Sequence, residues 1–203
     1  IQWLGPIDLP GELAIFHRRY PGIQISVWNS TVSGLLERLR AGELDLVYLA
    51  SDQPLPDDLV GYSAYREELV LITPPEHRLA GRDRVRWAEL NDEPFVEFTE
   101  GSAVSGIVRR ITEQLGLRRR AVGRVTQIDL QLALVAAGLG VAVVQETLGR
   151  SIPGLAIAEL IEPRTTWSVS LVGRAPAPSN PAPSNPAAAA LLDHLVAGTT
   201  RVR

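Results

Sequence analysis

Apolar residues recur along the chain at two spacings, one typical of amphipathic helices and the other of strands. The first helical stripe is formed by Leu9, Leu13, Phe16 and Tyr20. Asp8 precedes this stripe as a candidate helix cap, and the alternating segment 23–28 after it predicts a half-buried strand. A second stripe at 32–39 and an apolar run at 46–49 continue the alternation. This order predicts parallel strands joined by right-handed helical crossovers.

The second half of the chain repeats the pattern. The expected elements are a strand at 95–98, a helix at 104–115 and a strand at 122–126. The stretch 129–145 then predicts a helix capped by Asp129, a turn at Gly138 and Gly140, and a strand covered on both faces. Because the first part of this stretch is apolar apart from Gln131, we expect its helix to be buried.

The remaining segments suggest how the two halves are joined. Three further strands and a final helix are expected at 69–72, 155–160, 168–172 and 187–196. Residues 76–90 are polar and rich in turn formers, and the tandem A-P-S-N-P repeat at 177–186 predicts a mobile, polyproline-type loop. We expect two α/β lobes, lobe I from 1–71 plus 158–203 and lobe II from 72–157. A chain that crosses twice forms a hinge, and the cleft between the lobes is the default ligand site.

Ligands of open parallel sheets bind at the carboxyl ends of strands, where helix N-termini point. Each such N-terminus favours an anion by about 0.3–1 kcal/mol, so several together would orient a small carboxylate. The alternative is that Thr31, Ser102 and Asp129 are simply helix caps. The candidate effector-binding residues at the four strand-to-helix junctions are Gln2, Trp3, Leu4, Thr31, Phe98, Thr99, Ser102, Thr126, Gln127 and Ile128.

Composition narrows the classes of function. The chain has 203 residues and no cysteine, which excludes disulfides, thiol chemistry and cysteine–zinc sites. A net charge of −3 and a pI of 5.7 argue against a dedicated nucleic-acid surface. No run approaches the roughly 18 apolar residues of a membrane span. Since no methionine stands at position 1, we expect the natural chain to begin further upstream.

Residues that could support catalysis show no organised pattern. The three histidines are far apart in sequence, and we expect each to lie on the solvated surface. The same expectation holds for the pairs Glu67-Glu68 and Asp57-Asp58. For the basic cluster at 118–120 we expect a solvated loop or an inter-subunit contact, the alternative being contact with a phosphate backbone. Gly138-Leu139-Gly140 precedes a strand, so it predicts a turn and not a dinucleotide-binding loop. We therefore expect no catalytic residue, no metal ligand and no cofactor.

Several segments together resemble the effector-binding region of LysR-type transcriptional regulators. They occur in the order and spacing of that family across nearly the whole chain, at 9–23, 35–47, 68–72, 77–80, 87–90 and 134–144. The resemblance implies a two-lobed α/β fold like that of type 2 periplasmic-binding proteins, with each lobe a mostly parallel sheet flanked by helices. It also implies an effector in the interlobe cleft, bound at the same four junctions. The chain departs from the family at Gln145, where a proline is usual, and in its A-P-S-N-P repeat.

The resemblance further implies a cytoplasmic, non-membrane protein whose DNA-binding winged helix–turn–helix lies upstream and is absent from this chain. This domain would form a homodimer, the full-length protein a tetramer, and DNA would be contacted only through the upstream domain. One rival is a free solute-binding protein of the same fold that serves a transporter. The other is an enzyme of prephenate dehydratase-like or deaminase type, which would need an acid/base pair in the cleft. The sequence names neither the effector nor the target promoter, nor does it tell an activator from a repressor.

Overall fold

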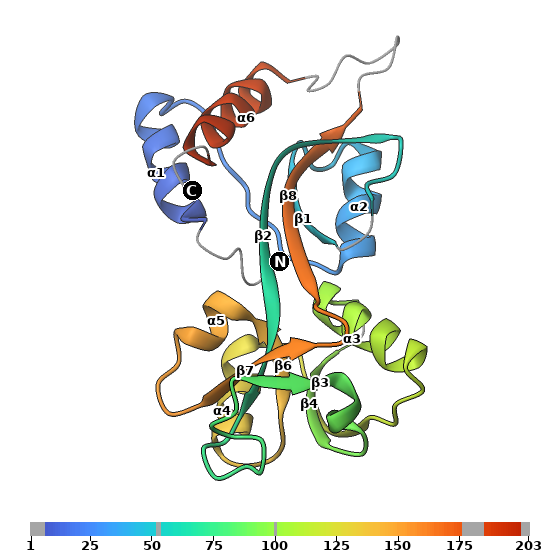
Figure 1. Cartoon of the computed structure of the whole chain (residues 1–203). Coiled ribbons are helices and arrows are strands. Elements are labelled where there is room, and N and C mark those ends of the chain that lie inside the picture. Colours follow the sequence, from blue (N-terminus) through green and yellow to red (C-terminus); the bar gives the residue numbers. More distant parts are fainter. Residues whose placement is uncertain (1–6, 52–53, 100, 176–184, 200–203) are drawn as a thin grey trace. The chain divides into compact units, whose positions relative to one another are not determined.

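The computed structural model describes residues 7–51, 54–99, 101–175 and 185–199 (Figure 1). The chain divides into two compact units. Unit 1 contains the described residues up to Tyr65 and from Ser168 onward, and unit 2 runs from Arg66 to Trp167. The crossings thus lie at 65/66 and 167/168, whereas the sequence pattern suggested 71/72 and 157/158.

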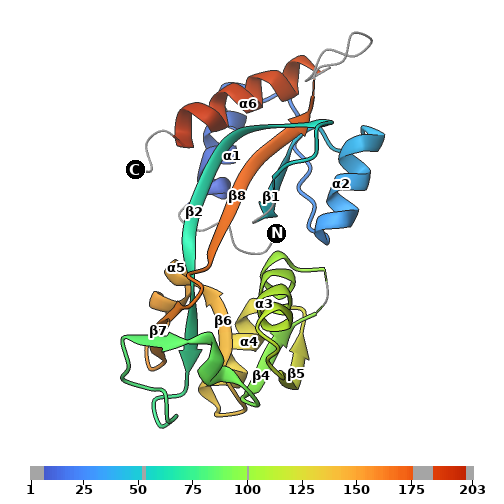
Figure 2. The ribbon, with the colours of Figure 1, turned by 45° about the vertical axis from the view of Figure 1, so that its right-hand side comes forward.

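Unit 1 combines three helices with one side of a mixed sheet. Its elements are α1 (Leu9–Arg19), α2 (Val32–Ala41), β1 (Val47–Ser51), the first part of β2 (Leu59–Thr73), most of β8 (Thr166–Arg174) and α6 (Pro186–Thr199). The strand order is β1-β8-β2, and β1 runs antiparallel to β8 with Val47 opposite Val172. Helix α6 packs beside α1 (Figure 2), so the C-terminal segment returns to the start of the chain.

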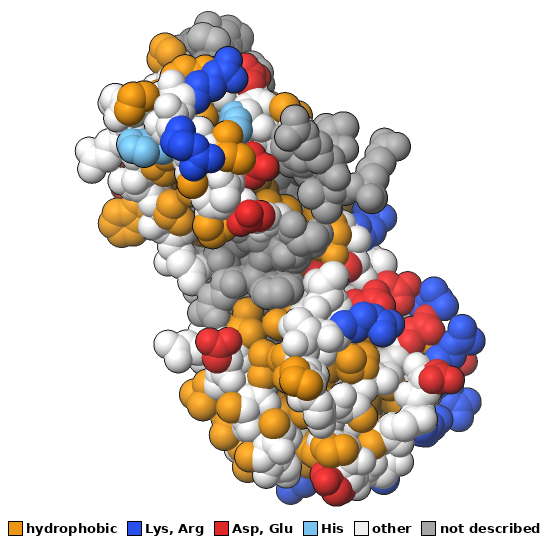
Figure 3. Space-filling model, turned by 90° about the vertical axis from the view of Figure 1, so that its left-hand side faces the viewer, with side chains coloured by type: hydrophobic (Ala, Val, Ile, Leu, Met, Phe, Trp, Pro, Cys, Tyr) orange, Lys and Arg blue, Asp and Glu red, His pale blue; other side chains and the backbone are white. Residues whose placement is uncertain are grey.

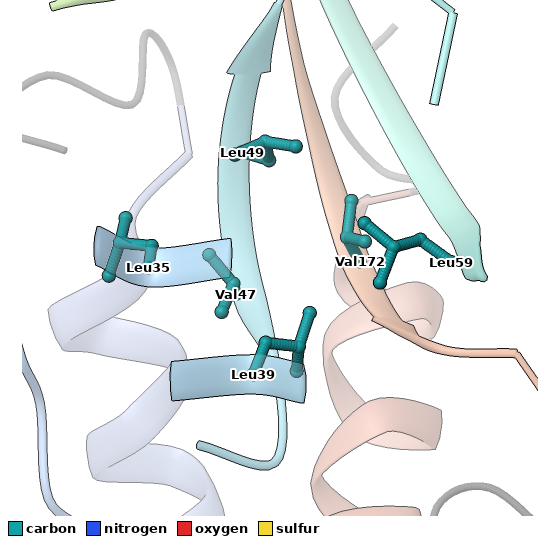
Figure 4. Close-up of a cluster of buried hydrophobic side chains, with 6 residues drawn as sticks. All are labelled: Leu35, Leu39, Val47, Leu49, Leu59 and Val172. Carbon is teal, nitrogen blue, oxygen red and sulfur yellow. The ribbon is translucent and has the colours of Figure 1, made fainter. Parts of the chain in front are cut away.

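The core of unit 1 joins α2 to the sheet. Its buried residues come from α2, β1, β2 and β8, and they are Leu35, Leu39, Val47, Leu49, Leu59 and Val172 (Figure 4). Burying each aliphatic side chain contributes about 1.5–3 kcal/mol. The apolar stripe of α2 therefore packs against the inward-facing residues of the three strands.

The first two helices of unit 1 have the caps that the sequence predicted. The carboxylate of Asp8 accepts the N–H of Gly11 at 3.0 Å at the start of α1. Thr31 caps α2, which ends at Gly42 in the left-handed conformation with φ 77°. These local signals determine where each helix begins or ends.

Unit 2 contains the other strands of the six-stranded sheet and a separate two-stranded sheet. Its elements are the second part of β2, β3 (Arg84–Arg86), the 3-10 helix η1 (Trp87–Leu90), β4 (Pro94–Phe98), α3 (Ala103–Gln114), β5 (Arg120–Val125), α4 (Ile128–Ala136), β6 (Ala142–Gln145), α5 (Glu146–Arg150) and β7 (Ala156–Ile161). β2 pairs antiparallel with both β6 and β7, while β3–β7 and β4–β5 are parallel pairs. The expected α/β class is confirmed, with sheets that are mixed because β2 and β8 carry the chain in opposite directions.

Two segments differ from the sequence-based prediction. Residues 23–28 form no strand. The polar segment 76–90 contains β3 and η1 in place of an open loop. Its apolar residues Leu79, Val85, Trp87 and Leu90 are at most 1% exposed. These four residues follow neither a helical nor a strand spacing, so periodicity did not reveal that the segment is buried.

The stretch 129–145 folds as helix, turn and strand, with two corrections. Helix α4 begins at Ile128 after Gln127, so Asp129 lies in the first turn and is not the cap. The polar Gln131 is buried, and its amide donates to the carbonyl of Val96 at 2.9 Å, whereas the apolar Leu130 is 47% exposed. Helix α4 is therefore not covered on all sides. Gln131 can be buried because its amide is hydrogen-bonded to a strand carbonyl. A pattern of apolar positions in the sequence cannot show such a bond.

No helix among the described residues is long and apolar enough to cross a membrane.

Candidate functional site

Thr31 is the candidate site residue in unit 1 that the structure describes. Its hydroxyl oxygen accepts the N–H of Gly34 at 3.2 Å and lies 3.2 Å from the hydroxyl of Ser33. The residue is exposed at the N-terminus of the 10-residue helix α2. The cap interpretation of Thr31 is therefore confirmed, and its hydroxyl proton has the Ser33 oxygen or a ligand atom as its acceptor.

Two candidate junctions of unit 2 lie side by side. β4 and β5 are parallel neighbours with Phe98 opposite Val125, and the N–H of Thr99 donates to the carbonyl of Val125 at 2.9 Å. The turn at 98–102 therefore adjoins the turn at 126–128, because both follow the carboxyl ends of paired strands. The structure brings Phe98, Thr99, Ser102, Thr126, Gln127 and Ile128 to one edge of unit 2.

Ser102 has the same role in unit 2 that Thr31 has in unit 1. Its hydroxyl oxygen accepts the N–H of Ser105 at 3.1 Å at the start of the 12-residue helix α3. Gln127 occupies the corresponding position before α4 and makes no cap hydrogen bond with its side chain. The positive ends of α3 and α4 therefore lie at the same edge as the two turns.

A buried glutamine fixes these two turns relative to each other. Gln131 of α4 is 4% exposed, and its amide donates to the carbonyl of Val96 in β4. Val96 stands two residues before Phe98, and Gln131 stands one turn after Gln127. Sequence analysis did not predict this role, because Gln131 looked like the single wet position of an apolar helix.

Gln2, Trp3 and Leu4, the other candidate site residues, lie outside the described residues. The remaining candidates carry hydroxyl, amide, aromatic and aliphatic groups and no charge. Because the oxygens of Thr31 and Ser102 already accept a backbone N–H, each hydroxyl can serve a ligand as a donor. Together with helix N-termini, such donors suit a ligand that presents acceptor atoms and negative charge.

Gln145, where the chain departs from the LysR pattern, is the last residue of β6. It pairs with Leu69 of β2 and is 7% exposed. It also precedes α5 and makes no cap hydrogen bond with its side chain. Gln145 is therefore held inside unit 2, beside β2, the strand that leads from unit 1 into unit 2.

Two histidines that we expected on the solvated surface are in fact paired. The Nδ1 of His77 accepts the N–H of Leu79 at 3.3 Å, so its Nε2 carries the proton and donates to Glu93 at 3.2 Å. The Nε2 of His194 lies 2.9 Å from the carboxylate of Glu12, which links α6 to α1. Both histidine side chains are less than one fifth exposed. The sequence analysis placed both histidines in solvent because their partners, Glu93 and Glu12, are distant in sequence.

Glu67 is a further correction, because it is 8% exposed and not a solvated charge. The oxygen Oε2 accepts both the N–H and the hydroxyl of Thr147, at 2.8 and 2.7 Å. Its neighbour Glu68 is paired with Arg164 at 3.2 Å. The two carboxylates of this pair thus differ because they lie on opposite faces of β2.

Most described basic side chains of unit 2 form ion pairs, as Figure 3 illustrates by its interleaved acidic and basic groups. In the basic cluster at 118–120, Arg118 pairs with Asp92 at 2.9 Å and Arg119 with Glu97 at 2.7 Å. These contacts favour the structural interpretation of the cluster over a phosphate-binding one. Among the described residues, no three histidine, aspartate or glutamate side chains gather as metal ligands would.

A comparison with protein families decides the identity. Residues 2–199 match the model of the LysR substrate binding domain. The chain belongs to this LysR family. The chain also resembles a probable hydrogen peroxide-inducible genes activator of Mycobacterium avium, with 30% identity over 98% of this chain and 64% of that protein. An uncharacterized HTH-type transcriptional regulator of Bacillus subtilis is 27% identical over 82% of this chain and 55% of its own length. These LysR relatives are transcriptional regulators and not enzymes.

Solved LysR structures share the fold. The effector binding domain of QuiR in complex with shikimate superimposes with a TM-score of 0.78 at 16% identity, covering 98% of this chain and 93% of that one. The CcmR regulatory domain of Synechocystis PCC6803 in complex with 2-PG gives 0.73 at 24% identity, covering 94% and 90%. The chain spans 55% and 64% of the lengths of the two curated relatives described above.

Proposed function

We propose that this LysR domain is the ligand-sensing part of a cytoplasmic transcription factor and that it binds a small carboxylate in the cleft between its lobes. The observation that carries the proposal is the state of the two capping hydroxyls. Thr31 and Ser102 each accept a backbone N–H, at 3.2 and 3.1 Å. We infer that the Ser33 hydroxyl, 3.2 Å from that of Thr31, donates to Thr31, so that Thr31 and Ser102 each donate a proton to an acceptor on the ligand. Both stand at positive helix ends.

The adjoining turns of unit 2 supply further groups of the kind that a small acid needs. Thr99, Thr126 and Gln127 follow paired strands, and Phe98 beside them adds an apolar surface. Gln2, Trp3 and Leu4 complete the proposed set. Two solved structures that share this fold are complexes with small molecules, shikimate in QuiR and 2-PG in CcmR. We infer a ligand of this size and polarity here.

The effector acts by favouring one arrangement of the lobes. A ligand can shift such an equilibrium only by its difference in affinity for the two states. In the full-length protein, the shift would pass through an oligomer to DNA-binding domains that precede Ile1. This domain would itself pair as a homodimer, the whole protein would form a tetramer, and DNA would be contacted only through the upstream domain.

A thermal-shift screen of metabolite acids tests the proposal. An acid present at 100 times its dissociation constant adds about 2.7 kcal/mol to the free energy of unfolding. We expect at least one small carboxylate to raise the melting temperature, while its neutral amide or ester does not. Equal shifts from the acid and its neutral form would contradict the carboxylate assignment.

The pairing of domains is tested separately by size-exclusion chromatography with light scattering over a range of concentrations. We expect a concentration-dependent dimer. A strict monomer at every concentration would contradict the proposed homodimer while leaving the ligand proposal intact.

A further inference from the structure

Two side-chain atoms at one end of unit 2 are buried without a hydrogen-bond partner among the described residues. They are the carboxylate oxygen Oε1 of Glu67 on β2 and the indole nitrogen Nε1 of Trp167 on β8. Glu67 is 8% and Trp167 1% exposed, so bulk solvent does not reach these two atoms. A buried polar atom that has lost water and gained no partner is costly, and each case calls for a physical explanation.

The remaining oxygen of Glu67 is fully engaged and holds the side chain in place. Oε2 accepts the N–H of Thr147 at 2.8 Å and its hydroxyl at 2.7 Å. Glu67 cannot turn toward solvent without breaking both bonds. The free acceptor Oε1 is therefore fixed in position.

Burial alone does not deprive an indole of a partner in this fold. Trp87 is 0% exposed in the same unit, and its Nε1 donates to the carbonyl of Pro163 at 3.0 Å. The missing partner of the Trp167 indole is therefore explained by the position of Trp167 in the fold and not by burial as such. That place is the last residue of unit 2 before the chain returns to unit 1.

Glu67 and Trp167 belong to neighbouring strands that run in opposite directions. β2 leads from unit 1 into unit 2, β8 leads back, and the two are adjacent in the sheet (Figures 1 and 2). The N–H of Leu69 donates to the carbonyl of Thr165 at 2.9 Å. Continued from this bond without a bulge, antiparallel register places Glu67 of β2 opposite Trp167 of β8. The unused acceptor and the unused donor thus belong to neighbouring strands, close to the crossing between the units.

We propose that Oε1 of Glu67 accepts the indole N–H of Trp167 in a second arrangement of β2 and β8, and that this hydrogen bond stabilises that arrangement against the one described here. The inference rests on the proposed function, which requires two arrangements of the domain. A small relative shift of two packed strands is a common way to build such a two-state element. The Glu67–Trp167 pair is then the contact that differs between the two states.

Relaxation dispersion of the tryptophan indole ¹⁵N nuclei tests the pair in the domain without any effector. Hinge and strand motions on the microsecond to millisecond timescale contribute exchange to such data. We expect exchange at Trp167, whose signal is assigned by its loss in Trp167→Phe. We expect none at Trp87, which keeps its bond to Pro163.

Two matched variants isolate the acceptor. Glu67→Gln keeps an amide oxygen for Thr147 but places an NH₂ donor at Oε1, so the exchange at Trp167 should disappear. Glu68→Gln removes the same charge from the next residue, which pairs with Arg164 at 3.2 Å, and should leave the exchange unchanged.

Three results would overturn the inference: no exchange at Trp167, exchange that persists in Glu67→Gln, or a nuclear Overhauser effect from a bound water to this indole proton. If Glu67→Gln does not fold, the wild-type data decide. The minor state should show a downfield indole proton, as expected for a bond to a carboxylate, and an upfield proton would refute the pair. Because no effector is used, this failure would leave the proposed function standing. A domain that shows the exchange but binds no acid would refute only the proposed function.

Discussion

At the scale of single residues, the domain contains buried polar groups whose partners decide their effect on stability. Glu67, Gln131 and His77 each found a partner far away in sequence. Tyr48 is the counterexample in unit 1, because its hydroxyl is buried and has no hydrogen-bond partner among the described residues. Such groups are where substitutions should have their clearest effects.

Burial and the nearby negative charge of Glu12 raise the pKa of Tyr48 to about 12. An unfolded tyrosine ionises near pH 10, so the neutral folded form contributes stability below pH 10 that is lost as the pH rises toward 12. Tyr48→Phe should therefore reduce the loss of stability between pH 10 and 12. At pH 7 it should stabilise the domain by about 1–3 kcal/mol, because it removes an unsatisfied hydroxyl.

Urea unfolding at pH 7, 10 and 11 measures this effect. Tyr62→Phe is the control, because burial raises the pKa of Tyr62 as well, while its hydroxyl is not among the unpartnered buried atoms. A Tyr48→Phe domain that is less stable than wild type at pH 7 would show that the hydroxyl has a partner in solution.

Gln131 gives a second prediction at this scale. Gln131→Leu should destabilise the domain by about 1–3 kcal/mol, because the carbonyl of Val96 loses its 2.9 Å amide partner inside the fold. The reverse exchange, Leu130→Gln, places an amide at a position that is 47% exposed and should change stability by at most about 0.5 kcal/mol. Similar effects of both substitutions in denaturant titrations would contradict the assigned role of Gln131.

At the scale of elements, local signals predicted the long helices and most strands, and they missed the short elements β3, η1 and α5. Asp8 was predicted as a cap, and capping by Thr31 and Ser102 was the alternative to a role in ligand binding. These caps are visible in the sequence because capping depends on residues three positions apart. β3 and η1 were missed, since their burial depends on contacts such as that of Trp87 with Pro163 across the unit. Asp129 was taken for a cap because it is the better capping residue, yet α4 begins before it.

The turn between α4 and β6 depends on the space available to its backbone. A Cβ atom at Gly140 would overlap the carbonyl oxygen of Pro94, where β6 closes on β4. Gly140→Ala should cost on the order of 1–3 kcal/mol or more, because two strands must separate.

Gly106 in α3 is the matched control for Gly140. A Cβ there would meet nothing within 4 Å, so Gly106→Ala should stabilise the domain by about 0.5–1 kcal/mol through its better helix propensity. Thermal unfolding compares the two variants. Equal effects of the same chemical change would show that backbone packing at Gly140 does not limit this turn.

At the scale of the whole molecule, sequence alone predicted the family, the α/β class and the pairing of turns at strand ends. The family was visible because several short segments keep their order over nearly the full length, and the match over 2–199 confirms it. The adjacency of 98–102 and 126–128 followed from the rule that parallel strands end at one edge. The polar contacts near the crossings could not be predicted, because they join β2 to α5 and to the residue before β8, far away in sequence.

The central claim is that the Thr31 hydroxyl donates to an anionic effector. Isothermal titration of the best acid from the thermal-shift screen into three proteins tests it: wild type, Thr31→Ser and Thr31→Asp. Both substitutions keep an oxygen that can cap α2, but only serine keeps the O–H. We predict near-wild-type affinity for Thr31→Ser and at least a tenfold loss for Thr31→Asp, because a new carboxylate repels the anion by about 1–4 kcal/mol. Unchanged affinity in Thr31→Asp would contradict the account.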